Sequence, residues 1–106
     1  MSEETYSFFP DEVKAQLPGL YSQDGADDPT VYVKFFQPWG AWTWFATEGE
    51  QQGEDFICFG YVIGFEKEWG YFSLNELSSV TGPMGLKIER DIHFSPKKKS
   101  EIPDIT

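Results

Sequence analysis

Residues 30–47, TVYVKFFQPWGAWTWFAT, contain the pattern that decides the fold. The first seven are β-branched or aromatic except for one lysine, which is typical of a β-strand. Val31, Val33 and Phe35 share one predicted face, because side chains alternate along a strand. Proline and glycine at 38–40 then indicate a tight turn before a second aromatic run. Two such runs joined by about four residues predict a β-hairpin.

The segments that follow extend this predicted sheet. Residues 56–65, FICFGYVIGF, predict a third strand, and Tyr71-Phe72 a short fourth one. The polar residues 48–55, EGEQQGED, are expected to form an acidic loop before the third strand. Alternation over 86–94, LKIERDIHF, predicts a last strand. Its inward side chains are expected to be Leu86, Ile88, Ile92 and Phe94.

Two short helices accompany these strands. Pro10, followed by two acidic residues, suits the start of a helix, which Pro18-Gly19 would end. Ser73 and Glu76 fit a capping box that opens a second helix at about 74–80. The sequence therefore predicts an α+β fold, in which a mostly antiparallel sheet of four to five strands carries one or two short helices packed on one face.

The chain of 106 residues is too short for two ordinary domains, so a single domain spanning 1–106 is expected. Its ordered core is predicted at about 10–96. The acidic and aromatic residues 1–9 and the tail from Ser95, which contains Lys97–Lys99, are expected to be flexible, extended or frayed.

Charge and composition exclude several classes of protein. Eighteen acidic and eight basic residues give a formal net charge of −10 and a pI near 4.3. Direct nucleic-acid binding is not expected, because lysine and arginine supply the affinity for phosphates. Neither a membrane-spanning run nor a basic leader is evident, so a cytoplasmic protein without a membrane partner is expected. One cysteine excludes an internal disulfide.

The residues that most often perform catalysis do not form a motif. Cys58 falls on the buried third strand, whereas His93 falls on a solvent-facing side of the last strand. A catalytic Cys–His pair is therefore not expected. Glu89, Asp91 and His93 share one strand face and could ligate a metal, but no second anchoring strand is identifiable. The sequence therefore predicts no enzyme, no metal site and no cofactor.

Arg90 falls on the inward parity of the same predicted strand. A buried guanidinium needs a carboxylate partner, because an unpaired buried charge is costly. Glu66 or Glu68 is the predicted partner in a structural ion pair, and binding of a ligand anion is the alternative.

Four segments resemble a known family: LPGLYSQ (17–23), VKFFQPWGAWTWFATEGE (33–50), DFICFGYVIGFEKEWGYFSLNEL (55–77) and GPMGLKIERDIHFSP (82–96). They are similar to the small proteins grouped as domain-of-unknown-function family 2958, over about residues 10–96. Members of that family occur mostly on bacterial plasmids, integrative elements and phages. The resemblance implies this setting, and it implies no activity and no catalytic residue.

Tryptophans and acidic segments carry the strongest functional signal in the sequence. Tryptophan and tyrosine dominate interface hot spots, and spaced carboxylates complement a basic partner surface. Core packing and ordinary solubility are the alternative explanations of the same residues. The predicted partner-binding residues are Asp24, Asp27, Asp28, Glu48, Glu50, Glu54, Asp55, Trp39, Trp42, Trp44 and Trp69.

These observations lead to the hypothesis of a non-enzymatic, acidic, protein-binding accessory protein of a phage or mobile genetic element. Its partner would be a protein with a basic surface, such as a nucleic-acid-binding host defence complex (CRISPR or restriction) that it inhibits stoichiometrically. The alternative is a nucleic-acid-handling accessory factor for single-strand binding, replication or conjugation. In that case an aromatic sheet face would stack bases and Lys97–Lys99 would contact phosphates.

Overall fold

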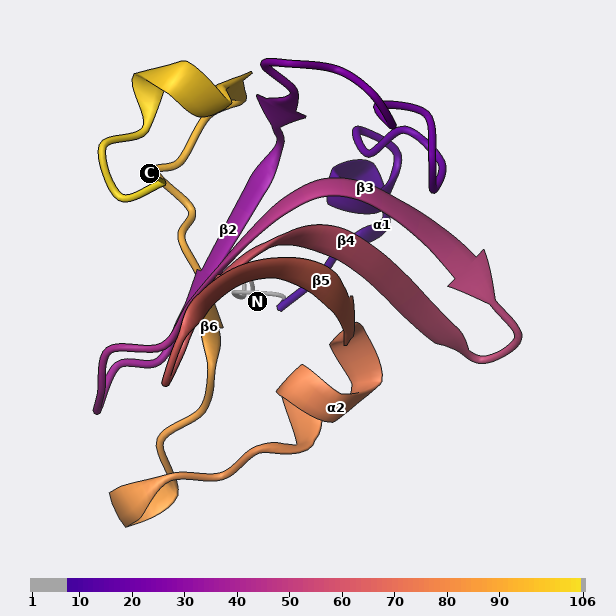
Figure 1. Ribbon diagram of the computed structural model, residues 1–106. Coiled ribbons are helices and arrows are strands. Elements are labelled where there is room, and N and C mark those ends of the chain that lie inside the picture. The colour runs from indigo at the N-terminus through magenta and orange to yellow at the C-terminus, as the bar shows by residue number, and fades with distance from the viewer. Residues whose placement is uncertain (1–7, 106) are drawn as a thin grey trace.

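The computed structural model describes residues 8–105, and a five-stranded antiparallel sheet forms its centre (Figure 1). The strands lie in the order β5-β4-β3-β2-β6. Their bounds are Val33–Phe36 for β2, Thr43–Gln52 for β3, Asp55–Ile63 for β4, Lys67–Ser73 for β5 and Glu89–Arg90 for β6. A separate pair joins β1 (Thr30–Val31) to β7 (Lys97–Lys98).

Short helices complete the described structure. They are α1 (Asp11–Lys14), α2 (Leu74–Ser79) and the 3-10 turns η1 (Pro83–Gly85) and η2 (Lys99–Glu101). The cap predicted for α2 is present, because the Ser73 hydroxyl accepts a hydrogen bond from the Glu76 amide at 3.1 Å. The sheet arches over α2 (Figure 1), and the predicted α+β fold with a mostly antiparallel sheet is confirmed.

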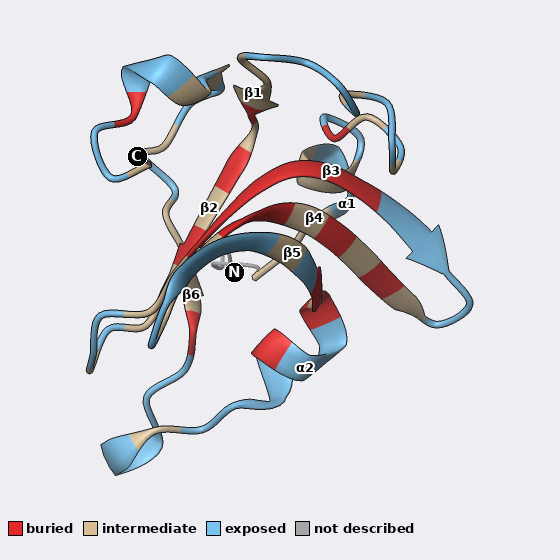
Figure 2. Cartoon of the chain, viewed as in Figure 1, coloured by how far each residue is buried: buried red, intermediate tan, exposed pale blue. Residues whose placement is uncertain are grey.

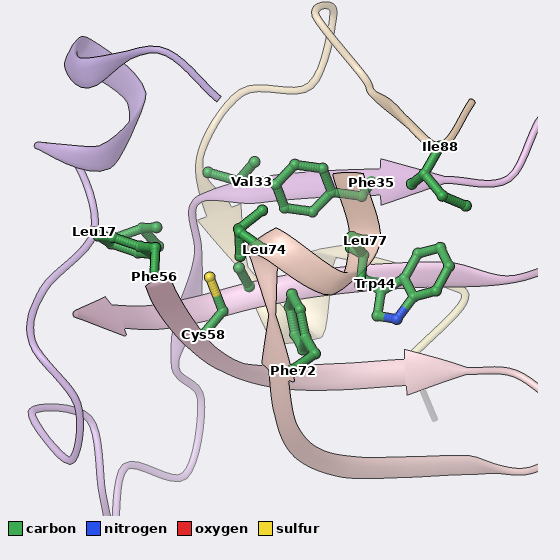
Figure 3. Packing of buried hydrophobic residues seen from close by; sticks show 11 residues of the cluster. Leu17, Val33, Phe35, Trp44, Phe56, Cys58, Phe72, Leu74, Leu77 and Ile88 are labelled. Carbon is green, nitrogen blue, oxygen red and sulfur yellow. The ribbon is translucent and has the colours of Figure 1, made fainter. Parts of the chain in front are cut away.

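Buried side chains form a separate cluster on each face of the sheet. The concave face packs against Leu74 and Leu77 of α2, as Figure 3 shows. Phe45 and Tyr61 pack on the opposite face against Ile102 from the end of the chain. Burial is concentrated on β2, β3 and β4, whereas most of β5 and the outer end of β3 are exposed (Figure 2).

The predicted acidic loop at 48–55 is wrong. β3 continues to Gln52 and β4 begins at Asp55, so Gly53 and Glu54 alone form the turn. Gly53 has a φ of 63°, a left-handed conformation that glycine adopts without strain. The polar side chains extend a long hairpin into solvent, because backbone pairing does not require apolar side chains there.

A β-bulge at Thr47 breaks the regular alternation of the sheet. The pairing of β3 with β4 shifts register between Ala46 and Glu48, which leaves Thr47 as an extra residue. Such bulges bend and twist the strands around them. The neighbouring strand is interrupted between β1 and β2, so Val31 packs in the cluster opposite to that of Val33. The prediction that these valines share a face is therefore wrong.

The last predicted strand is much shorter than its alternation suggested. Only Glu89 and Arg90 pair with β2, and Leu86 and Ile92 are exposed although Ile88 is buried. The Asp91 carboxylate accepts a hydrogen bond from the His93 amide at 2.9 Å, a local contact that favours a turn over strand continuation.

The lysine-containing tail is not extended away from the domain. Lys97 and Lys98 pair with β1, and Ile102 is 6% exposed in the second cluster. Residues 97–102 therefore close over the sheet face opposite to α2, so the prediction of a core that ends near residue 96 with a frayed tail is wrong. Residues 1–7 of the predicted flexible N-terminus lie outside the described residues. Within residues 8–105, the helices are all too short and too polar to cross a membrane.

Candidate functional site

Two side chains fix the loop of residues 19–29 onto β3. Glu48 is 4% exposed, and its two carboxylate oxygens accept hydrogen bonds from the amides of Tyr21 at 2.7 Å and Gln23 at 2.9 Å. The Gln23 side chain donates to the carbonyls of Thr30 and Thr47, both at 2.9 Å, and accepts from the Thr30 amide at 2.8 Å. The bulge therefore places one carboxylate and two strand carbonyls where they hold this loop.

The loop holds Tyr21 in an uncommon conformation. Its φ of 72° lies in the left-handed region, which non-glycine residues rarely adopt. The bidentate contact of Glu48 spans this residue and compensates the backbone cost. The phenol is 67% exposed and meets the Tyr71 ring at a centroid distance of 6.5 Å. The loop thus delivers an aromatic side chain to the edge strand β5.

Aromatic rings form a continuous row on the sheet face opposite to α2. Phe59 of β4 contacts Tyr71 at 4.9 Å and Trp69 at 6.1 Å between ring centroids, and Trp69 contacts Tyr61 at 5.2 Å. Phe59 is paired with Tyr71, and Tyr61 with Trp69, across the β4–β5 ladder. We call the set Tyr21, Phe59, Tyr61, Trp69 and Tyr71 the aromatic row.

A cleft of about 280 Å³ lies between the loop and the aromatic row. Four rings of the row line it, and it reaches Thr47 at the bulge. Its charged lining residues are Asp24, Glu48 and Lys99. We call this feature the aromatic cleft. It is bounded by segments from both ends of the chain, because Lys99 belongs to η2.

The pKa of the Tyr71 hydroxyl reflects the charges around the aromatic cleft. A hydrogen bond with Tyr21 and partial burial raise the pKa of Tyr71, and the negative charges of Glu48 and Asp24 raise it further. Carboxylates therefore disfavour a second negative charge at this position. The same field favours a positively charged group in the cleft.

The predicted acidic residues divide into structural and exposed groups. Glu48 anchors the loop, and Asp28 accepts hydrogen bonds from the amide and hydroxyl of Ser100, which hold the Asp28 pKa below its usual value. Asp55 joins β4 to α2. Only Asp24, Asp27, Glu50 and Glu54 remain exposed. The seven residues therefore do not form the pair of solvated loops that the sequence predicted.

Asp55 makes three contacts that depend on its charge. Its carboxylate accepts from the Ser73 hydroxyl at 2.5 Å, from the Phe56 amide at 2.7 Å and from the Asn75 amide at 3.1 Å. The bond from Ser73 is the largest cause that holds the Asp55 pKa below the usual value of 3.8. A carboxyl with a lowered pKa stabilises the fold above its unfolded-state pKa, and this contribution is lost as the pH falls.

We therefore expect Asp55→Asn to destabilise the protein at neutral pH. We also expect its free energy of unfolding to depend less on pH in the acidic range than that of the wild type. The difference in free energy of unfolding between wild type and variant should shrink as the pH falls from about 5 to about 3. Urea unfolding at several pH values measures it, with Glu54→Gln as the adjacent exposed control. A difference that stays constant across this range would contradict the role of Asp55.

The four tryptophans do not form one exposed patch. Trp44 is 8% exposed in the concave core, and Trp42 stacks on it at 5.8 Å. Trp39 is half-buried and packs against the same cluster. Trp69, at 38% exposure, is the only tryptophan in the aromatic cleft. Three of the four tryptophans predicted to bind a partner therefore pack in or against the concave core, as the core-packing alternative expected.

Tyr21, Phe59 and Tyr71 are site residues that the sequence did not reveal. Trp69 and Tyr71 are two apart on an edge strand, which is a recognisable signal for one exposed aromatic face. Phe59 becomes part of it only through the β4–β5 register. Tyr21 joins through the left-handed turn, which no local pattern indicates.

The Cys58–His93 pair considered for catalysis is not brought together. Cys58 is buried in the concave cluster, where burial raises the pKa of its thiol, and His93 is exposed near the opposite face. Asp91 lies 3.9 Å from the Lys34 ammonium. Across residues 8–105, no group of three His, Cys, Asp or Glu side chains is placed to hold a metal ion.

Arg90 lies on β6, at the edge of the sheet opposite to β5. Its Nε donates a hydrogen bond to the Phe8 carbonyl at 3.1 Å. Glu68 belongs to β5 and Glu66 to the turn before it, so the strand order does not favour either predicted ion pair. The alternation of the predicted strand placed Arg90 on the inward side, and in the structure this residue is partly buried.

A small α+β sheet protein with an aromatic cleft on one face is the class that these features define. The model of the family described as "Protein of unknown function (DUF2958)" matches residues 10–102, and the chain belongs to this family. No curated protein and no solved structure matches it significantly. The match continues past the predicted limit at residue 96 and includes all residues that line the aromatic cleft.

Proposed function

We propose that this chain is a non-enzymatic binding protein that takes up a basic segment of a partner protein in the aromatic cleft. The observation that carries this proposal is a preformed hollow with exposed tyrosine and tryptophan side chains on a chain of net charge −10. Aromatic residues in concave sites supply much of the affinity of protein interfaces. Solvent-exposed rings from two separate segments, Tyr21 of the loop and Trp69 and Tyr71 of β5, are difficult to explain by core packing alone.

The surrounding charge supports a basic partner. Asp24 and Asp27 are exposed on the loop that forms one wall of the cleft. Complementary charge accelerates association and selects against acidic competitors, and added salt weakens this effect. The aromatic cleft then supplies the short-range contacts and the net charge supplies the steering.

The family resemblance implies that the protein is encoded on a phage or mobile element, and this suggests which kind of partner it binds. On a phage or mobile element, a protein that binds a basic surface fits the stoichiometric inhibition of a host complex that itself binds nucleic acid, such as a CRISPR or restriction complex. Occupation of a basic surface needs no catalytic residue. The anti-defence role thus rests on charge and on the resemblance, whereas partner binding rests on the aromatic cleft.

We expect Trp69→Ala to abolish capture of the partner, because it removes the indole that two other rings contact in the cleft. Loss of a central aromatic anchor should weaken binding by about thirtyfold. Phe65→Ala is the matched control, since Phe65 is 95% exposed in the β4–β5 turn and does not line the cleft. Affinity purification from a bacterial host with tagged wild type and both variants, followed by mass spectrometry, measures the effect.

Wild type and Phe65→Ala should retain the same basic protein, and Trp69→Ala should lose it. Retention of that protein by folded Trp69→Ala would overturn the proposal.

Nucleic-acid handling is the second candidate, and one observation favours it. Lys99 lines the same cleft as Trp69, so an ammonium and a base-sized ring lie together. Stacking platforms for single strands normally lie in a basic groove, whereas Asp24 and Glu48 line this one. Salt-sensitive quenching of Trp69 fluorescence by single-stranded DNA would favour this candidate over the binding of a basic protein.

A further inference from the structure

We infer that the aromatic cleft accepts one cationic head group, an arginine guanidinium or a lysine ammonium from a basic segment, and holds it by cation–π contacts. This inference rests on the proposed function, because it specifies which chemical group of the partner enters the cleft.

The ring geometry suits a cation. Phe59 and Tyr71 meet at an interplanar angle of 60°, Tyr21 and Tyr71 at 65°, and Phe59 and Trp69 at 19°. The ring faces are therefore presented in more than one direction. A cation interacts with a ring within about 6 Å of its centroid. Because neighbouring centroids are 4.9 to 6.5 Å apart, one cation can contact two rings at once.

The size of the cleft favours a side chain over a larger ligand. Its volume of about 280 Å³ lies just below the range of about 300–1,000 Å³ that is typical of sites for drug-sized molecules. A guanidinium or ammonium with part of its alkyl stem fits such a space. The stem would also cover apolar ring surface, as these side chains commonly do.

Two carboxylates make the cleft selective for positive charge. Glu48 is held by two backbone amides, so it contributes a fixed field and not a flexible contact. Asp24 is exposed and lines the cleft. The hydrogen bond with Tyr21 and partial burial are the main causes of the raised pKa of Tyr71, and the negative charges of Glu48 and Asp24 add to it.

The chain already pairs its own cations with rings on this face. Lys97 Nζ lies 4.9 Å from the Phe94 centroid, and Lys34 Nζ lies 5.7 Å from that of Phe45. Lys99 is the one basic residue among those that line the cleft. It should therefore compete with the partner, and its neutralisation should increase affinity for a cation.

The test uses two short peptides that differ in charge alone. One is acetyl-Gly-Ser-Arg-Ser-Gly-amide, and the other carries citrulline, the neutral isostere of arginine. Binding to the 15N-labelled full chain is followed at the backbone amides of Gln23 and Tyr71, which line the cleft in every variant, and also at the Trp69 indole signal where Trp69 is present. We expect the arginine peptide to bind about tenfold more tightly than the citrulline peptide. The difference should disappear in Trp69→Ala.

Two further variants test the charges separately. Lys99→Gln should tighten binding of the arginine peptide by about two- to fivefold, and Asp24→Asn should weaken it by a similar factor. Phe65→Ala should leave it unchanged. These substitutions are at exposed or half-buried positions, so the folded state should persist.

The outcomes separate this inference from the proposed function. Equal affinity for both peptides overturns the cation site, and the proposed function still stands if Trp69→Ala loses the partner. Charge discrimination without loss of the partner in Trp69→Ala supports the cation site and overturns the proposed function. Displacement of the arginine peptide by oligo(dT) at low salt, together with salt-sensitive quenching of Trp69, overturns the inference in favour of nucleic acid.

Discussion

Gly60→Ala is expected to unfold the protein or to destabilise it severely, whereas Gly70→Ala is expected to be harmless. Gly60 and Gly70 face each other across the β4–β5 ladder, so they share a sheet face, although Gly70 lies on the edge strand. A Cβ atom at Gly60 would lie within 1.7 Å of the Phe45 carbonyl oxygen and 3.0 Å of the Ala46 Cα. A Cβ atom at Gly70 would meet nothing within 4 Å.

The contact at Gly60 involves backbone atoms, which cannot rotate away as a side chain would. We therefore expect a loss of at least about 3 kcal/mol in the free energy of unfolding, compared with a total of about 5–15 kcal/mol for a typical domain. Gly70→Ala should be neutral or stabilising by up to about 1 kcal/mol, because glycine is unfavourable in a strand. Urea unfolding measures both, and equal stabilities of the two variants would contradict the described register.

Glu48→Gln is expected to have the second large effect, because it disconnects the loop that forms the cleft. An amide retains one acceptor oxygen but presents an NH2 group to the other backbone donor, at Tyr21 or Gln23. A buried donor without an acceptor costs about 1–3 kcal/mol, and the lost contacts are charge-assisted. We expect a loss of about 2–3 kcal/mol and faster hydrogen exchange at both amides.

Glu50→Gln is the matched control for that variant. Glu50 lies two residues further along β3, is exposed, and accepts one long bond of 3.4 Å from the Leu20 amide. Its substitution should change stability by less than about 0.5 kcal/mol. Equal effects of the two substitutions on stability and exchange would refute the anchoring role of Glu48.

Short sequence patterns predicted those strands, turns and helix caps that are determined by residues close together in the chain. The hairpin around Pro38 and Gly40, the third strand and the Ser73 cap were all evident, because turn residues, alternation and capping act within a few positions. The extent of the strands was less predictable. The polar end of β3 resembles a loop in composition, although its backbone pairs with β4.

The site depended on contacts between distant segments, and this explains what the sequence missed. Trp69 was identified, but its neighbours Tyr21 and Phe59 join it only through the folded chain. The sequence predicted Glu48 to be a solvent-exposed acidic residue of a loop. It is buried instead, because the bulge at Thr47 shifts the register of β3 at this position. The folding back of Lys97–Lys98 onto β1 could not be inferred, since no composition rule distinguishes a pairing lysine segment from a frayed one.

The most direct test of the central claim is the affinity of the captured partner for wild type and Trp69→Ala, measured by calorimetry at low and physiological salt. The aromatic cleft predicts binding about thirtyfold weaker in Trp69→Ala, affinity within about twofold of wild type in Phe65→Ala, and weaker binding by wild type as salt is added. A folded Trp69→Ala that binds the partner as tightly as wild type would contradict the assignment of this cleft as the binding site.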